Sequence, residues 1–135
     1  MIFETTKKSL ENWHQMIQVG DLSNLNELLA EDVVFRSPVA YKPYEGKHVV
    51  YFILSNVIQV FENFTYHREF YTEGGESVVL EFSANVNGKA LKGIDMIRFN
   101  AEGKIIDFEV MIRPMSGLTA LAEQMGARFA QYQPH

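Results

Sequence analysis

The stretch that decides the fold is SVVLEFSANVNG, residues 77–88. Its apolar side chains fall at alternate positions, at Val78, Leu80, Phe82, Ala84 and Val86. A period of two is expected for a strand with one buried face. Asn87-Gly88 is the strongest short-range signal for a hairpin turn. A returning strand over about 90–99, a turn at Asn100–Gly103 and a last strand over 104–113 complete an antiparallel meander.

Helices are predicted before and after this meander in the sequence. Leu10, Trp13 and Ile17 form one apolar stripe and indicate a helix over 4–19. The remaining elements are expected at 23–30 (a helix starting at Ser23), 33–37 (a strand), 47–61 (a helix), 65–72 (a strand) and 116–130 (an amphipathic helix). Helices that lead into a meander predict a single α+β domain over 1–135, with helices packed on one face of a curved sheet.

Composition excludes several classes of function. The chain of 135 residues has no cysteine, so it has neither disulfides nor a thiol nucleophile. A net charge of −5 argues against a nucleic-acid partner. The longest apolar run, Val49–Leu54, is too short to span a membrane, and no signal-peptide pattern is visible, so a cytoplasmic location is expected. The four histidines (14, 48, 67 and 135) lack metal-ligand spacing, and neither a metal nor a cofactor is expected.

The segment GIDMIRFN, residues 93–100, resembles the nuclear-transport-factor-2-like superfamily in its ketosteroid-isomerase and SnoaL-type branch. The segments GDL (20–22), FRSPV (35–39) and YEG (44–46) carry the same resemblance. It implies a cone-shaped, cystatin-like fold whose helices pack in the concave face of a strongly bent sheet around a deep apolar pocket. It also implies a homodimer formed through the other face of the sheet. The superfamily contains isomerases, cyclases, hydrolases and proteins without activity.

Asp95 is the main candidate for chemistry. Strand parity places it on the same face as Gly93 and Ile97, where the anion is disfavoured and the pKa should rise. A neutral carboxylic acid can donate a hydrogen bond in a dry site. The resemblance matches Asp95 to the acid that donates to the enolate oxygen in steroid isomerases. The alternative is a structural aspartate bonded to a hydroxyl or a backbone amide of the first helix.

Two other positions depart from the steroid isomerases. The resemblance places Trp13 at the position of a tyrosine and Ser37 at that of the general-base carboxylate. The alternatives are a core tryptophan on the helix stripe and a satisfied polar residue at a strand end. A serine without a base beside it cannot shuttle protons near neutral pH. Steroid isomerisation is therefore predicted to be absent or very weak. His48, at the start of a helix, is a second, weaker candidate proton shuttle; the alternative is an exposed histidine.

The epoxide-hydrolase type of site is also missing. Its arginine position is Gly93 here, and the last strand should turn Ile106, Phe108, Val110 and Ile112 toward the pocket, with no acid among them.

The candidate ligand-binding residues are Trp13, Ile17, Phe35, Ser37, Tyr44, Phe52, Phe82, Ile97, Phe108, Val110 and Ile112. Two functions remain open. One is a cofactor-independent isomerase, cyclase or dehydratase that uses Asp95 on a small hydrophobic, carbonyl-bearing ligand. The other is a non-catalytic ligand-binding or accessory module. In either case a homodimer is expected through the sheet's outer face, where Met96, Arg98, Met111 and Arg113 fall.

Overall fold

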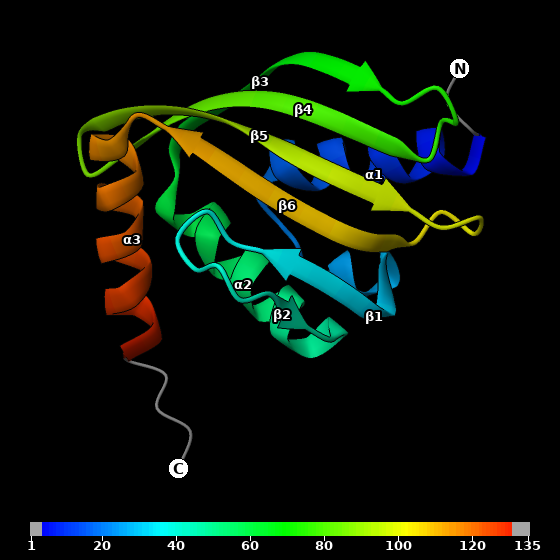
Figure 1. The fold of residues 1–135 in the computed structure, drawn as a ribbon, viewed down its shortest axis with the longest axis horizontal. Helices are drawn as coiled ribbons and strands as arrows, with labels where there is room; N and C mark the ends of the chain where they lie inside the picture. The colour runs from blue at the N-terminus through cyan, green and yellow to red at the C-terminus, as the bar shows by residue number, and fades with distance from the viewer. Residues whose placement is uncertain (1–3, 131–135) are drawn as a thin grey trace.

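A computed structural model describes residues 4–130 of the chain; His135 lies outside the described residues. The elements are α1 (Glu4–Val19), a 3-10 turn η1 (Leu25–Glu27), β1 (Leu29–Arg36), β2 (Tyr44–Glu45), α2 (Lys47–Val60), β3 (Glu62–Tyr71), β4 (Ser77–Val86), β5 (Lys89–Phe99), β6 (Ile105–Arg113) and α3 (Met115–Ala130). Figure 1 shows the long, bent strands and the helix α3 that crosses one end of them.

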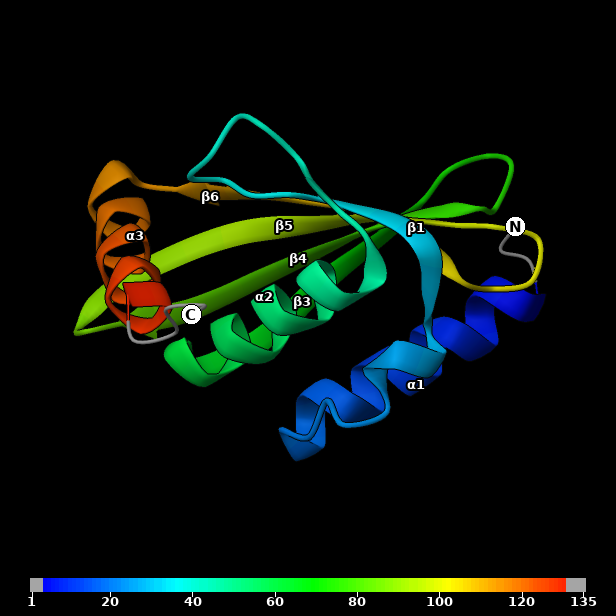
Figure 2. The same cartoon turned by 90° about the horizontal axis from the view of Figure 1, so that it is seen from below.

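The strands form one six-stranded sheet in the order β2-β1-β6-β5-β4-β3. Figure 2 shows α1 and α2 on the concave side of this sheet, with α3 at its end. The α+β class and the cystatin-like curvature predicted from the sequence are confirmed. The sheet is antiparallel except for one pair, because β1 runs parallel to β6.

The predicted meander is confirmed in β4, β5 and β6. Asn87 and Gly88 have φ values of 49° and 79°, as a two-residue turn of type I′ requires. The alternating side chains of β4 face inward and are nearly inaccessible, with Leu80 and Phe82 both 0% exposed. This buried face forms the floor on which the helices pack.

The predicted helix over 23–30 is wrong. A 3-10 turn of three residues replaces it, and the chain enters β1 at Leu29. Its apolar residues are nevertheless buried, with Leu25 0% and Leu29 2% exposed. A helix this short is marginal on its own, whereas Leu29 in the strand pairs with Ile105 of β6. Sheet pairing with a distant segment overrides the local helical pattern.

A β-bulge changes which residues at the start of β6 face the core. Register shifts between Arg98 and Phe99 of β5 give β6 one extra residue at this point. As a result Ile105 is 0% exposed, and Ile106, predicted to face the pocket, is only half-buried. Beyond the bulge the prediction holds, since Phe108 and Val110 are buried.

No helix within residues 4–130 is long and apolar enough to cross a membrane.

Candidate functional site

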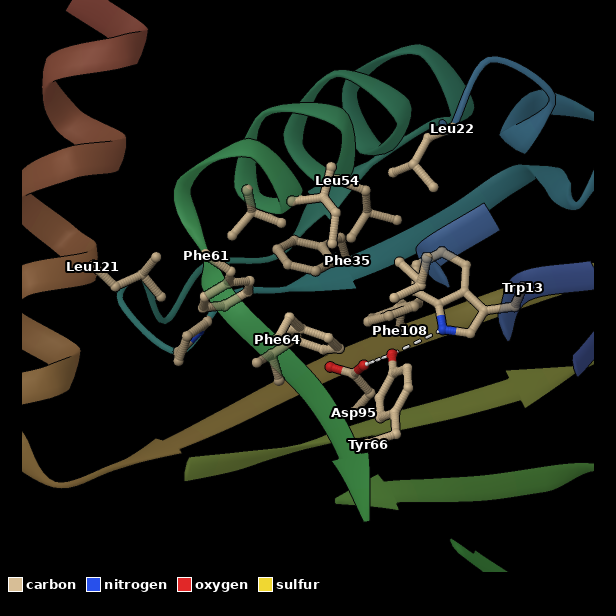
Figure 3. Close-up of a pocket in the computed structure, with 15 residues that line it drawn as sticks. Trp13, Leu22, Phe35, Leu54, Phe61, Phe64, Tyr66, Asp95, Phe108 and Leu121 are labelled. Carbon is tan, nitrogen blue, oxygen red and sulfur yellow. Dashed lines mark hydrogen bonds between the residues drawn. The ribbon is translucent and has the colours of Figure 1, made fainter. Parts of the chain in front are cut away.

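A small cavity of about 50 Å³ lies between the concave face of the sheet and the helices α1 and α2 (Figure 3). Its aromatic wall consists of Trp13, Phe35, Phe61, Phe64, Tyr66 and Phe108. The aliphatic lining consists of Ile17, Leu22, Pro38, Leu54, Val57, Ile58, Val110 and Leu121. Asp95 completes the lining and is its one carboxyl group. The cavity thus offers a ligand an apolar, largely aromatic surface with a single acid.

Asp95 lies in the middle of β5 and is 5% exposed. Burial of the carboxyl raises the pKa of Asp95 to about 7 from an ordinary 3.8, although a hydrogen bond from Tyr66 lowers it. The lining contains no lysine, arginine or histidine that could hold the carboxyl as an anion. Both protonation states of Asp95 are therefore populated near neutral pH.

A chain of two hydrogen bonds orients this acid. The indole Nε1 of Trp13 donates to the hydroxyl oxygen of Tyr66 at 2.9 Å, and that hydroxyl donates to Oδ2 of Asp95 at 2.7 Å. The direction is fixed, because an indole N–H can only donate. Among the described residues, Oδ1 of Asp95 has no hydrogen-bond partner. Figure 3 shows this second carboxyl oxygen turned away from Tyr66 into the cavity.

Tyr66, which holds Asp95, is a cavity residue that the sequence analysis did not identify. Burial and the neighbouring Asp95 raise the pKa of Tyr66 well above 10.0, so it remains a neutral donor. The signal available in the sequence is weak: Phe64 and Tyr66 alternate with the polar residues Asn63, Thr65 and His67. In the structure these two side chains are half-buried, whereas the other residues of β3 are exposed. The alternative predicted that Asp95 bonds to a hydroxyl or a backbone amide of the first helix. Asp95 does accept a hydrogen bond from a hydroxyl, but this hydroxyl belongs to Tyr66 of β3.

The structure brings six of the predicted site residues together around the cavity: Trp13, Ile17, Phe35, Asp95, Phe108 and Val110. Others are core residues behind it. Phe82 and Ile97 are 0% and 1% exposed and do not reach the cavity surface. Phe52 stacks on Phe129 of α3 at 5.6 Å between ring centroids. Ile112 borders a depression on the outer face of the sheet. These four residues are not part of the cavity wall.

Ser37 and Tyr44 are not part of the cavity either. They line a separate groove between the β1–β2 connection, α2 and α3. The hydroxyl of Ser37 accepts the backbone N–H of Val39 at 3.0 Å and so closes a local turn. Ser37, which the sequence analysis matched to the base of steroid isomerases, therefore lies outside the lining of the cavity that Asp95 faces.

His48 does not reach the cavity. It is exposed in the first turn of α2 and lines neither the cavity nor the groove. The inward face of α2 carries Val50, Ile53, Leu54 and Val57, which recur at helical spacing. His48 falls on the opposite side of the helix. The exposed-histidine interpretation is therefore correct.

No group of three or more histidine, aspartate or glutamate residues within the described chain could hold a metal ion.

Comparisons with known proteins agree with this geometry. The sequence profile of the SnoaL-like domain matches residues 10–108. A crystal structure of a steroid delta-isomerase from Pseudomonas aeruginosa is 56% identical and covers 97% of this chain and 96% of its own, with a TM-score of 0.96. An uncharacterised protein with a cystatin-like fold from Silicibacter pomeroyi is 36% identical, covers 93% and 88%, and has a TM-score of 0.85.

A more distant structure, an NTF2-like protein of unknown function from Mesorhizobium loti, is 18% identical and shares the fold, with a TM-score of 0.73 over 82% of this chain and 93% of its own. A search of curated proteins finds no match. The profile match spans most of the chain, and two similar structures exceed 30% identity. The chain therefore belongs to the SnoaL-like domain family, with the NTF2-like fold.

Proposed function

We propose that the protein binds a small, mostly apolar molecule whose carbonyl oxygen accepts a hydrogen bond from Asp95. The observation that carries this proposal is the unpartnered Oδ1 of Asp95 in an aromatic cavity. When Asp95 is protonated, its hydrogen lies on Oδ1, because Oδ2 accepts from Tyr66. A carbonyl oxygen is the matching acceptor. A ligand carboxylate is disfavoured, since the lining offers it no cation.

The catalytic form of this proposal is a cofactor-independent isomerase, cyclase or dehydratase in which Asp95 supplies and recovers a proton. A pKa of about 7 suits this role, because an acid–base group is most efficient when its pKa lies near the working pH. Proton donation from Oδ1 to the ligand oxygen leaves a carboxylate that Tyr66 stabilises through Oδ2. Trp13 keeps the Tyr66 hydroxyl in place.

The similarity to a steroid delta-isomerase supports an apolar carbonyl ligand. The described lining nevertheless contains only two titratable groups, Asp95 and Tyr66, and the hydroxyl of Tyr66 is already engaged. A double-bond shift that uses separate donor and base groups lacks its second group, because Ser37 lies in the groove. We therefore expect steroid isomerisation to be slow.

Non-catalytic ligand binding is the second candidate, and the same observation favours it. With one acid and no separate base in the described lining, the cavity can recognise a carbonyl without converting it. Turnover distinguishes the two candidates, and binding is common to both.

The binding proposal can be tested with 2-heptanone and with heptane, which has the same chain but no oxygen. Trp13 is the chain's single tryptophan and lines the cavity, so its indole N–H gives one reporter signal in a ¹H–¹⁵N spectrum. We expect 2-heptanone to bind more tightly than heptane by roughly 2- to 12-fold, the value of one neutral hydrogen bond. Asp95→Leu should abolish this preference and Asp95→Asn should retain it. Equal affinities for both compounds would contradict the proposal.

We also propose that the outer face of the sheet forms a homodimer. Met96 of β5 lies opposite Glu109 of β6 and Met111 of β6 lies opposite Ile94 of β5, so the two methionines are diagonal to one another; they are 37% and 47% exposed. Arg98, Glu109 and Arg113 surround them with charges of both signs, which suits the rim of a self-complementary interface.

A further inference from the structure

The groove that contains Ser37 and Tyr44 is a second apolar space next to the cavity; we call it the outer groove. It has a volume of about 180 Å³. Its walls come from the β1–β2 connection, from Ile53 of α2, and from Ala122, Met125 and Gly126 of α3. Its lining has no charged residue, and its polar side chains are the hydroxyls of Ser37 and Tyr44.

The cavity and the outer groove meet at four residues. Phe35, Pro38, Val57 and Leu121 line both spaces. They come from β1, from the connection after it, from α2 and from α3, and all four are apolar. A ligand chain that extends past Val57 and Leu121 from the cavity into the outer groove would meet no charged side chain in either lining. Asp95 lines only the cavity, so the polar anchor lies at one end of this path.

Helix α3 is fixed in the position that forms the outer groove. Near its end, Arg128 donates to Oδ1 of Asn56 at 3.1 Å and also to Gln59, both on α2. At its start, Gly117 lies so close to β5 that a Cβ would come within 2.6 Å of the Cβ of Leu91. Between these attachments, a Cβ added at Gly126 would meet nothing within 4 Å. Helix α3 is therefore held near both ends, and beside Gly126 the outer groove has free space.

We propose that the outer groove holds the distal, apolar part of the ligand whose oxygen binds Asp95. The ligand class is then an elongated ketone or aldehyde with its oxygen near one end and an alkyl or arylalkyl chain beyond it. A compact molecule would fill the cavity alone. This assignment rests on the proposed function for the polar end and adds the length of the ligand.

The experiment is a series of 2-alkanones with six to twelve carbons, titrated against the wild-type protein with the Trp13 indole signal as the readout. Each methylene that is fully buried should tighten binding by about fourfold. If the outer groove is used, affinity continues to rise after the cavity is full. If it is not, affinity reaches a plateau at a short chain length, and the proposal for the groove is overturned while the proposed function stands.

The decisive variant is Gly126→Leu, which fills the outer groove from a position where the added side chain has free space. It should bind short ketones as the wild type does and lose at least tenfold in affinity for the longest ones. Ala127→Leu is the matched control, because Ala127 is exposed on the same helix and does not line the groove. Unchanged binding of long ketones by Gly126→Leu would overturn the assignment. If ketones of every length fail to bind the wild type, the proposed function itself is wrong.

Discussion

Tyr66 of β3 reaches across β4 and donates its hydroxyl hydrogen to Oδ2 of Asp95 on β5 at 2.7 Å. This contact leaves Asp95 with one oxygen engaged and one oxygen facing the cavity. A buried acid of this kind has a fixed orientation, and its two oxygens have different roles. The contact can be tested through its effects on pKa, stability and activity.

The first prediction concerns the dependence of stability on pH. The pKa of Asp95 is about 7 in the folded protein, above its ordinary 3.8, so the folded state holds a proton that the unfolded chain releases between these values. This contribution to the free energy of unfolding is fully present below about pH 4 and is lost as the pH rises to about 7. Its slope is at most about 1.4 kcal/mol per pH unit.

Asp95→Asn removes this titration and keeps both the size of the side chain and its acceptor for Tyr66. Urea unfolding should therefore give similar stabilities for the two proteins near pH 4 and a more stable variant above pH 7. Stability curves that run parallel from pH 4 to pH 8 would contradict the raised pKa.

The second prediction concerns Tyr66→Phe. Since the bond from Tyr66 lowers the pKa of Asp95, its removal should raise that pKa further above 7, as a carboxyl ¹³C titration would report. The change also leaves the N–H of Trp13 without its acceptor, at a cost of about 1–3 kcal/mol in the free energy of unfolding. Tyr71→Phe is the control, because the Tyr71 hydroxyl donates to Glu69 instead. An unchanged pKa of Asp95 in Tyr66→Phe would show that this bond does not orient the acid.

The third prediction is slow steroid isomerisation. A positioned general base contributes roughly 10²–10⁴-fold to such a reaction, and the described lining offers no base besides Asp95. In a Δ5-3-ketosteroid assay we expect turnover weaker than that of a dedicated isomerase by this order. Ser37→Ala should not change it, because Ser37 faces the outer groove. Rapid turnover by both proteins would mean that another group acts as the base.

The fourth prediction is the homodimer. Light scattering at high micromolar concentration should give about twice the 15.5 kDa mass of one chain. The double variant Met96→Asp with Met111→Asp should be a monomer, because it places like charges opposite one another in a self-complementary face. Val19→Asp, at a position 69% exposed at the end of α1, should remain dimeric. A monomeric wild type would reject the proposal.

The fifth prediction compares two glycines of α3. Gly117→Ala forces a methyl group against Leu91 of β5 and the carbonyl oxygen of Ala90, and should lower the free energy of unfolding by about 1–3 kcal/mol. Gly126→Ala meets open space and should raise stability by up to about 1 kcal/mol, since alanine favours the helix. Thermal unfolding measures both. Equal effects would show that α3 does not pack closely on β5.

The meander and the three long helices could be predicted because their signals are local. The alternation in β4 and the Asn87-Gly88 turn lie within twelve residues. The start of β1 could not be predicted in this way, because Leu29 pairs with Ile105, far along the chain. The parity of Ile106 depends on a bulge that the alternation does not encode.

Some features of the candidate site likewise have local signals in the sequence, and others depend on contacts between distant segments. The burial of Asp95 follows from strand parity, and the position of Trp13 follows from the stripe of α1. The role of Tyr66 depends on the relative registers of three strands, including irregular pairing in β3 on both sides of Thr65-Tyr66. The placement of Ser37 and His48 depends on how the β1–β2 connection and α2 sit beside the cavity. None of these relationships is visible in the spacing of residues along the chain.

The parallel pairing of β1 with β6 constrains the order in which the chain folds. β1 and β2 join the rest of the sheet through β6 alone. On the ribosome, residues 29–36 therefore emerge long before β6, and until β6 has been synthesised the only strand that they can pair with is the two-residue β2. β3 to β6 form from neighbouring hairpins with short loops, whereas docking β1 closes a loop of about seventy residues, which is the slower kind of step. We therefore expect the wall of the cavity that contains Phe35 to be completed after the acid on β5 is already in its strand.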